Sequence, residues 1–226
     1  MRQVVTFGAY GTLIDFRLSD VVRQVLADRL PMDGVDSEEF FDDFRVMRFQ
    51  AVLEPYRGYR EVLRSSLQAA IRLHGIPHSP SDGDALVAAV PAFGPFPEVP
   101  GALRALKSPG YGIAIISNPD DDLITQNVAR IGVGFDHVIT AQQARAYKPD
   151  RQAFEYAYAV MDIAPARVTH VAQGWEYDLI PTRDLGLRRQ VWINRSGRPG
   201  SSLYRPYGEL PDLSAVPALL GIGHAS

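Results

Sequence analysis

The sequence contains no cysteine, and this absence excludes several kinds of chemistry. Disulfide bonds, thiolate metal sites and cysteine nucleophiles are all impossible, although a chain without cysteine is compatible with any redox compartment. Histidine is also sparse, and the spacing of its five members is not that of metal ligands: His74, His78, His137, His170 and His224. We therefore expect no histidine-bound metal ion.

An excess of charge of one sign is missing as well, because 23 basic residues nearly balance 26 acidic ones and leave a net charge of −3. Nucleic acids and anionic membranes usually require concentrated lysine and arginine, so neither is expected as a partner. The chain has no run of about 18 apolar residues, the length that a membrane span requires. Its apolar N-terminal stretch meets Gly8 too early for a secretory leader, and a cytoplasmic location is expected.

The residues that are present predict a folded α/β protein. Of the 226 residues, 46% are hydrophobic and 22% are charged, which is typical of a globular chain. Short apolar segments alternate with helix-like segments, and this alternation predicts a parallel sheet. The strand-like segments are 4–7, 111–117, 137–140, 168–172 and 190–194, and helix-like segments begin at 101, 120, 151 and 177. Ligands of such sheets bind beyond the carboxyl ends of the strands, where Gly8, Ser117 and Gln173 are expected.

Residues 16–92 follow a different pattern, with apolar positions at helical spacing and no convincing strand. Helices are expected over 19–30, 37–53, 59–75 and 81–90. The chain then returns through a proline-rich stretch at 90–101. We therefore predict a core domain formed by 1–15 and 93–226, with a helical cap domain, 16–92, inserted after the first strand.

Four short blocks occur in order along the chain: "TFGAYGTL" (6–13), "IISN" (115–118), "YKPD" (147–150) and "HVAQGWEYD" (170–178). Together with the following "GLRRQVWINRSG" (186–197), they resemble the haloacid dehalogenase superfamily, in particular its type II (S)-2-haloacid dehalogenase branch. The resemblance spans nearly the whole chain. It implies a Rossmann-like core with a small helical cap, a small anionic or carboxylate substrate and a homodimer.

The first block departs from that branch at its most important position. In type II dehalogenases an aspartate there displaces halide from the α-carbon and forms an ester, which water then cleaves. This chain has Gly8 instead, and glycine offers no atom with which to form the ester. The covalent mechanism that the resemblance implies is therefore unavailable.

Two charged residues of the family pattern remain as candidate catalytic groups. Lys148 matches the lysine that neutralises the nucleophile in the family, and Asp178 matches an acidic residue kept near that lysine. Without the nucleophile, Lys148 either attracts a substrate anion or, with a lowered pKa, acts as a base or amine nucleophile. Asp178 is either the remaining general base or half of a structural ion pair.

Further candidates surround these two residues. Tyr10 is expected to form a wall of the pocket, because a tyrosine at this position goes with dehalogenases rather than phosphatases. The Thr12 hydroxyl either donates to a bound anion or stabilises the turn. Ser117 and Asn118 match the block with which the family holds a carboxylate, and they are also placed to cap the following helix.

The last block departs from the family as well, at Gln173 and Trp175. Magnesium-dependent phosphatases carry a carboxylate at the position of Gln173. With Gly8 and Tyr10 at two further carboxylate positions, too few oxygen ligands remain for Mg²⁺, and no cofactor is expected. Trp175 either packs in the core or reshapes the pocket for a bulkier, flatter ligand.

In the predicted cap, Arg45 lies near the position of the arginine that receives the carboxylate or halide in the family, and Arg48 competes for that role. Three functions stay open. The first is an enzyme that works without an ester and uses Lys148 and Asp178. The second is a catalytically silent binding protein, and the third is an (S)-2-haloacid dehalogenase in which Gly8 is an inactivating replacement.

Overall fold

The computed structural model describes residues 3–31, 34–107 and 111–222 and contains a six-stranded parallel sheet. The strand order is β3-β2-β1-β4-β5-β6. The strands are β1 (Gln3–Phe7), β2 (Tyr111–Ser117), β3 (His137–Thr140), β4 (Val168–Ala172), β5 (Arg189–Ile193) and β6 (Gly208–Leu210). The predicted parallel α/β fold is confirmed, because the five predicted strands are present to within one residue at each end.

The sequence does not predict β6. This strand has only three residues, "GEL", without the alternation of apolar and polar side chains that marks a half-buried strand. It lies at the edge of the sheet, where pairing with β5 alone holds it in register.

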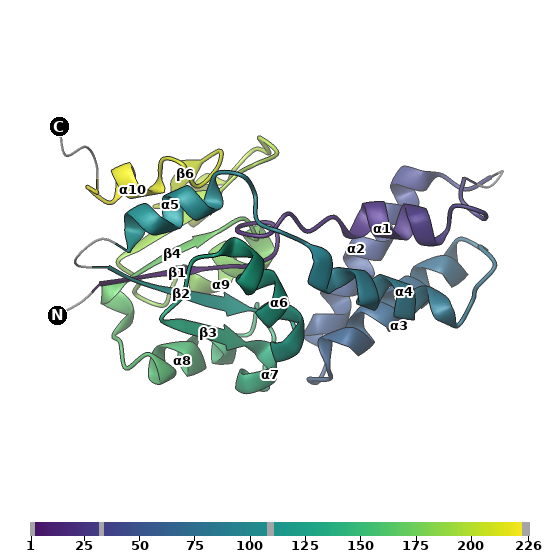
Figure 1. The fold of residues 1–226 in the computed structure, drawn as a ribbon, viewed down its shortest axis with the longest axis horizontal. Helices are drawn as coiled ribbons and strands as arrows, with labels where there is room; N and C mark the ends of the chain where they lie inside the picture. Colours follow the sequence, from purple (N-terminus) through teal and green to yellow (C-terminus); the bar gives the residue numbers. More distant parts are fainter. Residues whose placement is uncertain (1–2, 32–33, 108–110, 223–226) are drawn as a thin grey trace.

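Helices cover both faces of the sheet (Figure 1). Alternate residues of the central strands point to opposite faces, so Val5 and Ile113 pack against α5, α6 and α10, whereas Ile116 packs against α8. The helices around the sheet are α5 (Val99–Leu106), α6 (Asp121–Ile131), α7 (Ala141–Ala144), α8 (Arg151–Val160), α9 (Ile180–Thr182) and α10 (Val216–Leu219), with short turns η2 (Pro165–Arg167), η3 (Trp175–Leu179) and η4 (Ser202–Tyr204).

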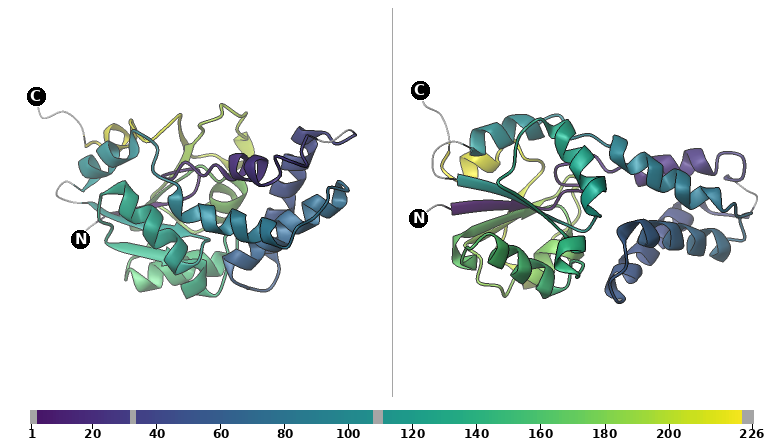
Figure 2. Two further views of the ribbon diagram at one scale, coloured as in Figure 1. Left: turned by 45° about the vertical axis from the view of Figure 1, so that its right-hand side comes forward. Right: turned by 60° about the horizontal axis from the view of Figure 1, so that its bottom comes forward.

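The residues between β1 and α5 form a group of helices beside the sheet, here called the helical segment (residues 18–92) (Figures 1 and 2). It contains α1 (Leu18–Val25), α2 (Ser37–Leu53), α3 (Tyr59–Leu73), α4 (Ser81–Ala89) and η1 (Val90–Ala92). Its apolar stripes bury a separate cluster that includes Phe40, Phe44, Leu63 and Leu67. The helix predicted at 19–30 is shorter than expected: it ends at Val25, and residues 26–29 form turns.

Two stretches of chain, 8–17 and 93–98, connect the helical segment to the sheet, and one side chain holds both. The guanidinium of Arg195, which follows β5, donates to the carbonyl of Thr12 at 2.8 Å and to Glu98 Oε1 at 2.6 Å. Asn127 of α6, which is fully buried, donates to the carbonyl of Phe93 at 3.0 Å. The connections are therefore fixed to the core by partly buried polar contacts.

The start of α3 is fixed to the core in a similar way. Asp120, just before α6, accepts hydrogen bonds from the backbone N–H of Tyr59 at 2.8 Å and of Arg60 at 3.1 Å. These N–H groups have no partner within their own helix, so a core carboxylate caps α3 across the junction. The Arg60 side chain also pairs with Asp122. This capping keeps Tyr59 against the carboxyl ends of the strands.

Candidate functional site

A cavity of about 400 Å³ lies where the carboxyl ends of β1, β2 and β4 face the helical segment. This is the position in which open parallel sheets bind ligands. Nine of the predicted site residues line it: Gly8, Tyr10, Arg45, Ser117, Asn118, Lys148, Gln173, Trp175 and Asp178. The strand ends thus bring together side chains from blocks that are far apart in the sequence.

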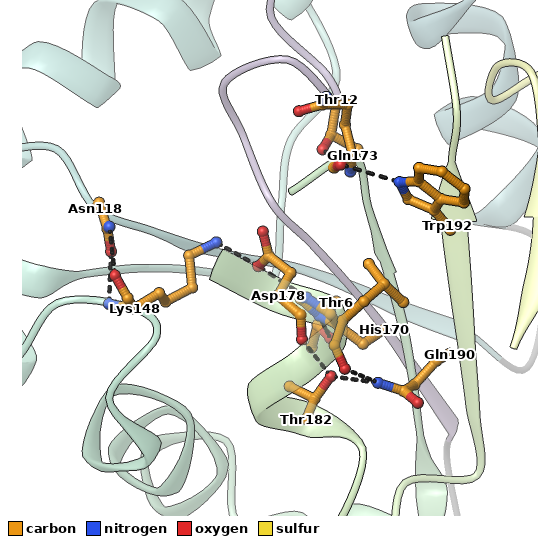
Figure 3. Close-up of polar contacts among 11 residues, drawn as sticks. Thr6, Thr12, Asn118, Lys148, His170, Gln173, Asp178, Thr182, Gln190 and Trp192 are labelled. Carbon is orange, nitrogen blue, oxygen red and sulfur yellow. Dashed lines mark hydrogen bonds and ion pairs between the residues drawn. The ribbon is translucent and has the colours of Figure 1, made fainter. Parts of the chain in front are cut away.

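An ion pair forms the floor of the cavity. Lys148 Nζ donates to Asp178 Oδ1 at 2.5 Å, and both side chains are almost completely buried (Figure 3). The side chain of Asn118 binds the backbone of Lys148. Its Oδ1 accepts from the backbone N–H of Lys148 at 2.8 Å, and its Nδ2 donates to the backbone carbonyl of Lys148 at 2.9 Å. The side chain of Asn118 therefore positions Lys148.

Asp178 belongs to η3, a single π-helical turn directly after β4. Such turns are rare and occur frequently at functional sites. The Thr182 hydroxyl donates to the Asp178 carbonyl at 2.5 Å, and Gln190 Nε2 donates to the Leu179 carbonyl at 2.8 Å (Figure 3). These buried hydrogen bonds satisfy backbone groups that the irregular turn leaves free, and they fix the direction of the carboxylate.

His170 continues the ion pair into the interior, a contact that the sequence analysis does not anticipate. Its Nε2 lies 3.0 Å from Asp178 Oδ1 and its Nδ1 lies 2.8 Å from Thr6 Oγ1, with the imidazole fully buried. A neutral ring satisfies both contacts when Nε2–H donates to the carboxylate and Nδ1 accepts from the hydroxyl. The sequence signal for His170 is its place as the first residue of the block that ends with Asp178.

Asp178 is held in its ionised form. Burial by itself raises the pKa of a carboxyl group, but the Lys148 ammonium and the His170 hydrogen bond outweigh it and lower the pKa of Asp178 below its usual range. Asp178 is consequently a carboxylate throughout the neutral range and a weak base.

This lowered pKa predicts a pH dependence of stability. The stabilisation is fully present above the unfolded-state pKa of about 4 and is lost as the pH falls through the lower pKa of the folded protein. We expect the difference in free energy of unfolding between the unchanged protein and Asp178→Asn to stay constant above about pH 4 and to shrink below it. Urea unfolding between about pH 3 and pH 6 measures this. A difference that stays constant at the acid end contradicts it.

The second carboxylate oxygen of Asp178 faces two glycines. A Cβ on Gly8 would lie 3.5 Å from Asp178 Oδ2 and 3.2 Å from Thr12 Oγ1, distances that small shifts accommodate. A Cβ on Gly174 would collide with the same Oδ2 and would lie 3.1 Å from the Cβ of Tyr177. Gly174 is therefore required for space, since its backbone angles suit any residue.

We expect Gly174→Ala to destabilise the protein by about 1–3 kcal/mol, the usual cost of overpacking, whereas Gly8→Ala costs less because its new methyl group meets no closer neighbour than Thr12. Chemical denaturation of the two variants compares them directly. If Gly8→Ala is instead the less stable variant, Asp178 moves away from residue 174 at little cost in free energy, and the expectation is wrong.

Thr12 is the one predicted site residue that does not line the cavity. Its buried Oγ1 accepts the backbone N–H of Gln173 at 2.8 Å (Figure 3). The carbonyl of Gln173 in turn accepts from Trp192 Nε1 at 3.1 Å. This contact matches the turn-stabilising alternative for Thr12. The hydroxyl hydrogen is still able to donate, so the contact of Thr12 with a bound anion stays a prediction.

The two candidate arginines of α2 differ in their surroundings. The side chain of Arg45 is 59% exposed at the mouth of the cavity and lies 3.6 Å from Asp42. Arg48 is more buried, with its guanidinium 4.8 Å from the centre of the Phe44 ring. Its Nε is buried, and no hydrogen-bond partner for it exists within the described residues. The guanidinium of Arg48 also interacts with the Tyr59 hydroxyl. Arg48 therefore lines the cavity with one buried donor that the described residues leave unsatisfied.

The family model for haloacid dehalogenase-like hydrolases matches residues 3–181. The chain belongs to this family.

Relatives of this chain include proteins named as dehalogenases. The chain is 26% identical to the (S)-2-haloacid dehalogenase of Pseudomonas sp. strain YL, over 92% of this chain and 88% of the relative. It is 36% identical to haloacetate dehalogenase H-2 of Moraxella sp. strain B, over 58% of this chain and 56% of the relative. The solved L-2-haloacid dehalogenase of Xanthobacter autotrophicus has the same fold, with a TM-score of 0.79 and 22% identity over 98% of this chain and 99% of that one.

The wall of the cavity is more aromatic than the family motifs alone indicate. Tyr10 stacks on Phe16 with ring centres 3.9 Å apart, and its hydroxyl donates to Asn127 Oδ1 at 3.0 Å. Phe49 of α2 packs edge-on against Tyr177 of η3 at 5.0 Å. Burial raises the pKa of Tyr10, and likewise that of Tyr177, so both hydroxyls stay protonated.

Trp175 both packs against other side chains and forms part of the cavity wall, the two roles considered for it from the sequence. It lines the cavity, and it also packs edge-on against Trp192, Tyr204 and Tyr207, with ring centres 4.7, 5.6 and 5.4 Å away. Three rings therefore hold this wall in place. Phe49, Tyr177 and Arg198 also line the cavity without being predicted from the sequence. Phe49 and Arg198 lie outside the short motifs, whereas Tyr177 lies within the last block, at a position to which the resemblance assigns no role.

Among the described residues, neither a cluster of metal-binding side chains nor a membrane-spanning helix is present. Within residues 3–31, 34–107 and 111–222, no group of three or more histidine, aspartate or glutamate side chains is arranged to bind a metal ion. The helices described there include none that is both long and apolar enough to cross a bilayer.

Proposed function

We propose that this member of the haloacid dehalogenase-like family acts on a small organic carboxylate without forming an ester on the protein. The observation that carries the proposal is the buried Lys148–Asp178 pair, whose free Oδ2 points to the space above Gly8. A carboxylate substrate is proposed because relatives of this chain bear the name (S)-2-haloacid dehalogenase. Residues 1–15 and 93–226 would form the core domain and 16–92 the cap domain.

The geometry supports attack on the electrophilic carbon of the substrate by water, in place of the aspartate that attacks in type II dehalogenases. Asp178 Oδ2 orients a water molecule and accepts its proton while the water oxygen bonds to the electrophilic carbon, and the leaving group departs with the electron pair of the broken bond. Because Asp178 is a weak base, most of the acceleration comes from positioning and from the Lys148 charge. Arg48 and Arg45 supply positive charge for the substrate carboxylate.

The test is a single-turnover reaction in oxygen-18 water. A panel of 2-substituted carboxylates is screened by mass spectrometry for products, and the intact protein is weighed after one turnover. The proposal expects label in the first product, no label in the protein, and loss of turnover in Lys148→Ala and Asp178→Asn. A covalent adduct on the chain, or full activity in both variants, would refute it.

A silent binding protein is the second candidate, and it is favoured by the mutual neutralisation of Lys148 and Asp178 beside a glycine. Thermal stabilisation by carboxylates without any product supports this function over the first. The third candidate, an (S)-2-haloacid dehalogenase with an inactivating glycine, is favoured by the names of the relatives and is tested by Gly8→Asp. The homodimer and the cytoplasmic location stay predictions.

A further inference from the structure

The cavity is larger than a short acid requires. An apolar cavity of about 150 Å³ is enough to hold benzene, whereas the space beside Lys148 is about 400 Å³. Trp175 does not collapse into this space, because three other rings pack against it. The cavity therefore has room for a ring in addition to a carboxylate and the short chain that joins them.

We propose that the preferred ligand is an aryl-substituted carboxylic acid, with its ring against the aromatic wall formed by Phe49, Trp175 and Tyr177 and its carboxylate on Arg48. The proposal rests on the carboxylate-binding site of the proposed function, but it does not depend on which reaction follows.

The aromatic wall comes from both sides of the cavity. Trp175 and Tyr177 belong to η3 of the core, and Phe49 extends from α2 of the helical segment and meets Tyr177 edge-on. Aromatic pairs contribute about 0.5–1.5 kcal/mol beyond the burial of apolar area, and flat rings fit edge-on and offset arrangements. A ligand ring gains such contacts here, whereas an alkyl acid gains burial alone.

Arg48 provides the matching group for the carboxylate. Its side chain lines the cavity and interacts with the Tyr59 hydroxyl, while its buried Nε has no partner within the described residues. The protein alone therefore does not satisfy all the donors of this guanidinium, and a carboxylate in the cavity would pair with the remaining charge. Phe44 packs under the guanidinium and restricts its motion. A carboxylate accepts two parallel hydrogen bonds from such a fixed guanidinium. Arg45 suits this role less well, because it is exposed and already lies close to Asp42.

Binding measurements test the inference without any need for turnover. Calorimetry compares propionate, 3-phenylpropionate and the neutral 3-phenylpropanol on the unchanged protein. We expect 3-phenylpropionate to bind at least about tenfold more tightly than either of the others, since full burial of a phenyl group and a charge-assisted contact each contribute that much or more.

Variants then locate the two halves of the ligand. Arg48→Gln should weaken 3-phenylpropionate by at least about tenfold and leave 3-phenylpropanol nearly unchanged. The matched control is Arg64→Gln, which removes an arginine of α3 that pairs with Asp84 outside the cavity. Arg45→Gln should cause a smaller loss than Arg48→Gln. Thermal unfolding without ligand verifies that each variant is folded.

Two results would overturn the inference. One is equal affinity for propionate and 3-phenylpropionate, and this comparison needs no variant. The other is unchanged affinity for 3-phenylpropionate in a folded Arg48→Gln. Failure of the proposed function shows itself differently, as aryl acids that bind with the expected preference and are never converted.

Discussion

Replacing Asp178 with asparagine is expected to destabilise the protein by about 3–5 kcal/mol, the usual cost of breaking a buried ion pair from one side. Lys148 Nζ contacts Asp178 Oδ1 at 2.5 Å, and the lysine side chain is only 6% exposed. Once the carboxylate is gone, the ammonium either remains charged without a partner or releases its proton. His170 also loses its charged acceptor. Urea unfolding at neutral pH measures the loss.

A second replacement distinguishes an unpaired charge from general damage to the turn. In the Asp178→Asn background, Lys148→Met removes the buried ammonium, and we expect it to recover a large part of the lost stability. Asp184→Asn is the matched control, because that carboxylate is 77% exposed and its replacement should change stability by less than about 0.5 kcal/mol. If Lys148→Met causes a further loss in that background, the ion pair does not explain the destabilisation.

The architecture is predictable from the sequence because its signals are local. The strands β2, β3 and β4 are continuous apolar runs, and α2 shows its helical spacing and begins after Asp36, whose carboxylate caps it. Sheet order then follows the rules of parallel α/β folds. The strand ends converge, so the residues that directly follow β1, β2 and β4 are found in one cavity.

The parts that the sequence does not predict depend on packing between distant segments. His170 gains its role only because β4 lies beside β1, which places Thr6 on one side of the ring and Asp178 on the other. Thr12 follows the family motif, yet its hydroxyl is used by Gln173, which is 161 positions away. The volume of the cavity depends on how the helical segment meets the core, and no motif encodes that distance.

Gly8→Asp is the change with the largest expected effect on activity. Removing the nucleophilic group of a hydrolase costs on the order of 10⁶ in turnover. If the third candidate function holds, even imperfect restoration should therefore raise halide release from 2-bromopropionate by about 100-fold or more. The Cβ of the new side chain would lie 3.2 Å from Thr12 Oγ1, a tight contact that a small shift of Thr12 relieves. Lys148 would be shared between the introduced carboxylate and Asp178, and mutual repulsion would raise the pKa of one of the two acids.

Gly8→Ala and Gly8→Asn are the matched controls for this gain, since they add the same Cβ or an isosteric amide without a nucleophilic carboxylate. Acid-quenched mass spectrometry should detect an ester on the peptide that contains residue 8 in the aspartate variant alone. If the cavity favours aryl acids, 2-bromo-3-phenylpropionate should lose bromide faster than 2-bromopropionate in that variant. A folded Gly8→Asp that releases no more halide than Gly8→Ala rejects the dehalogenase alternative. The change at Gly8 would then be one of several that altered this site, together with Gln173 and Trp175.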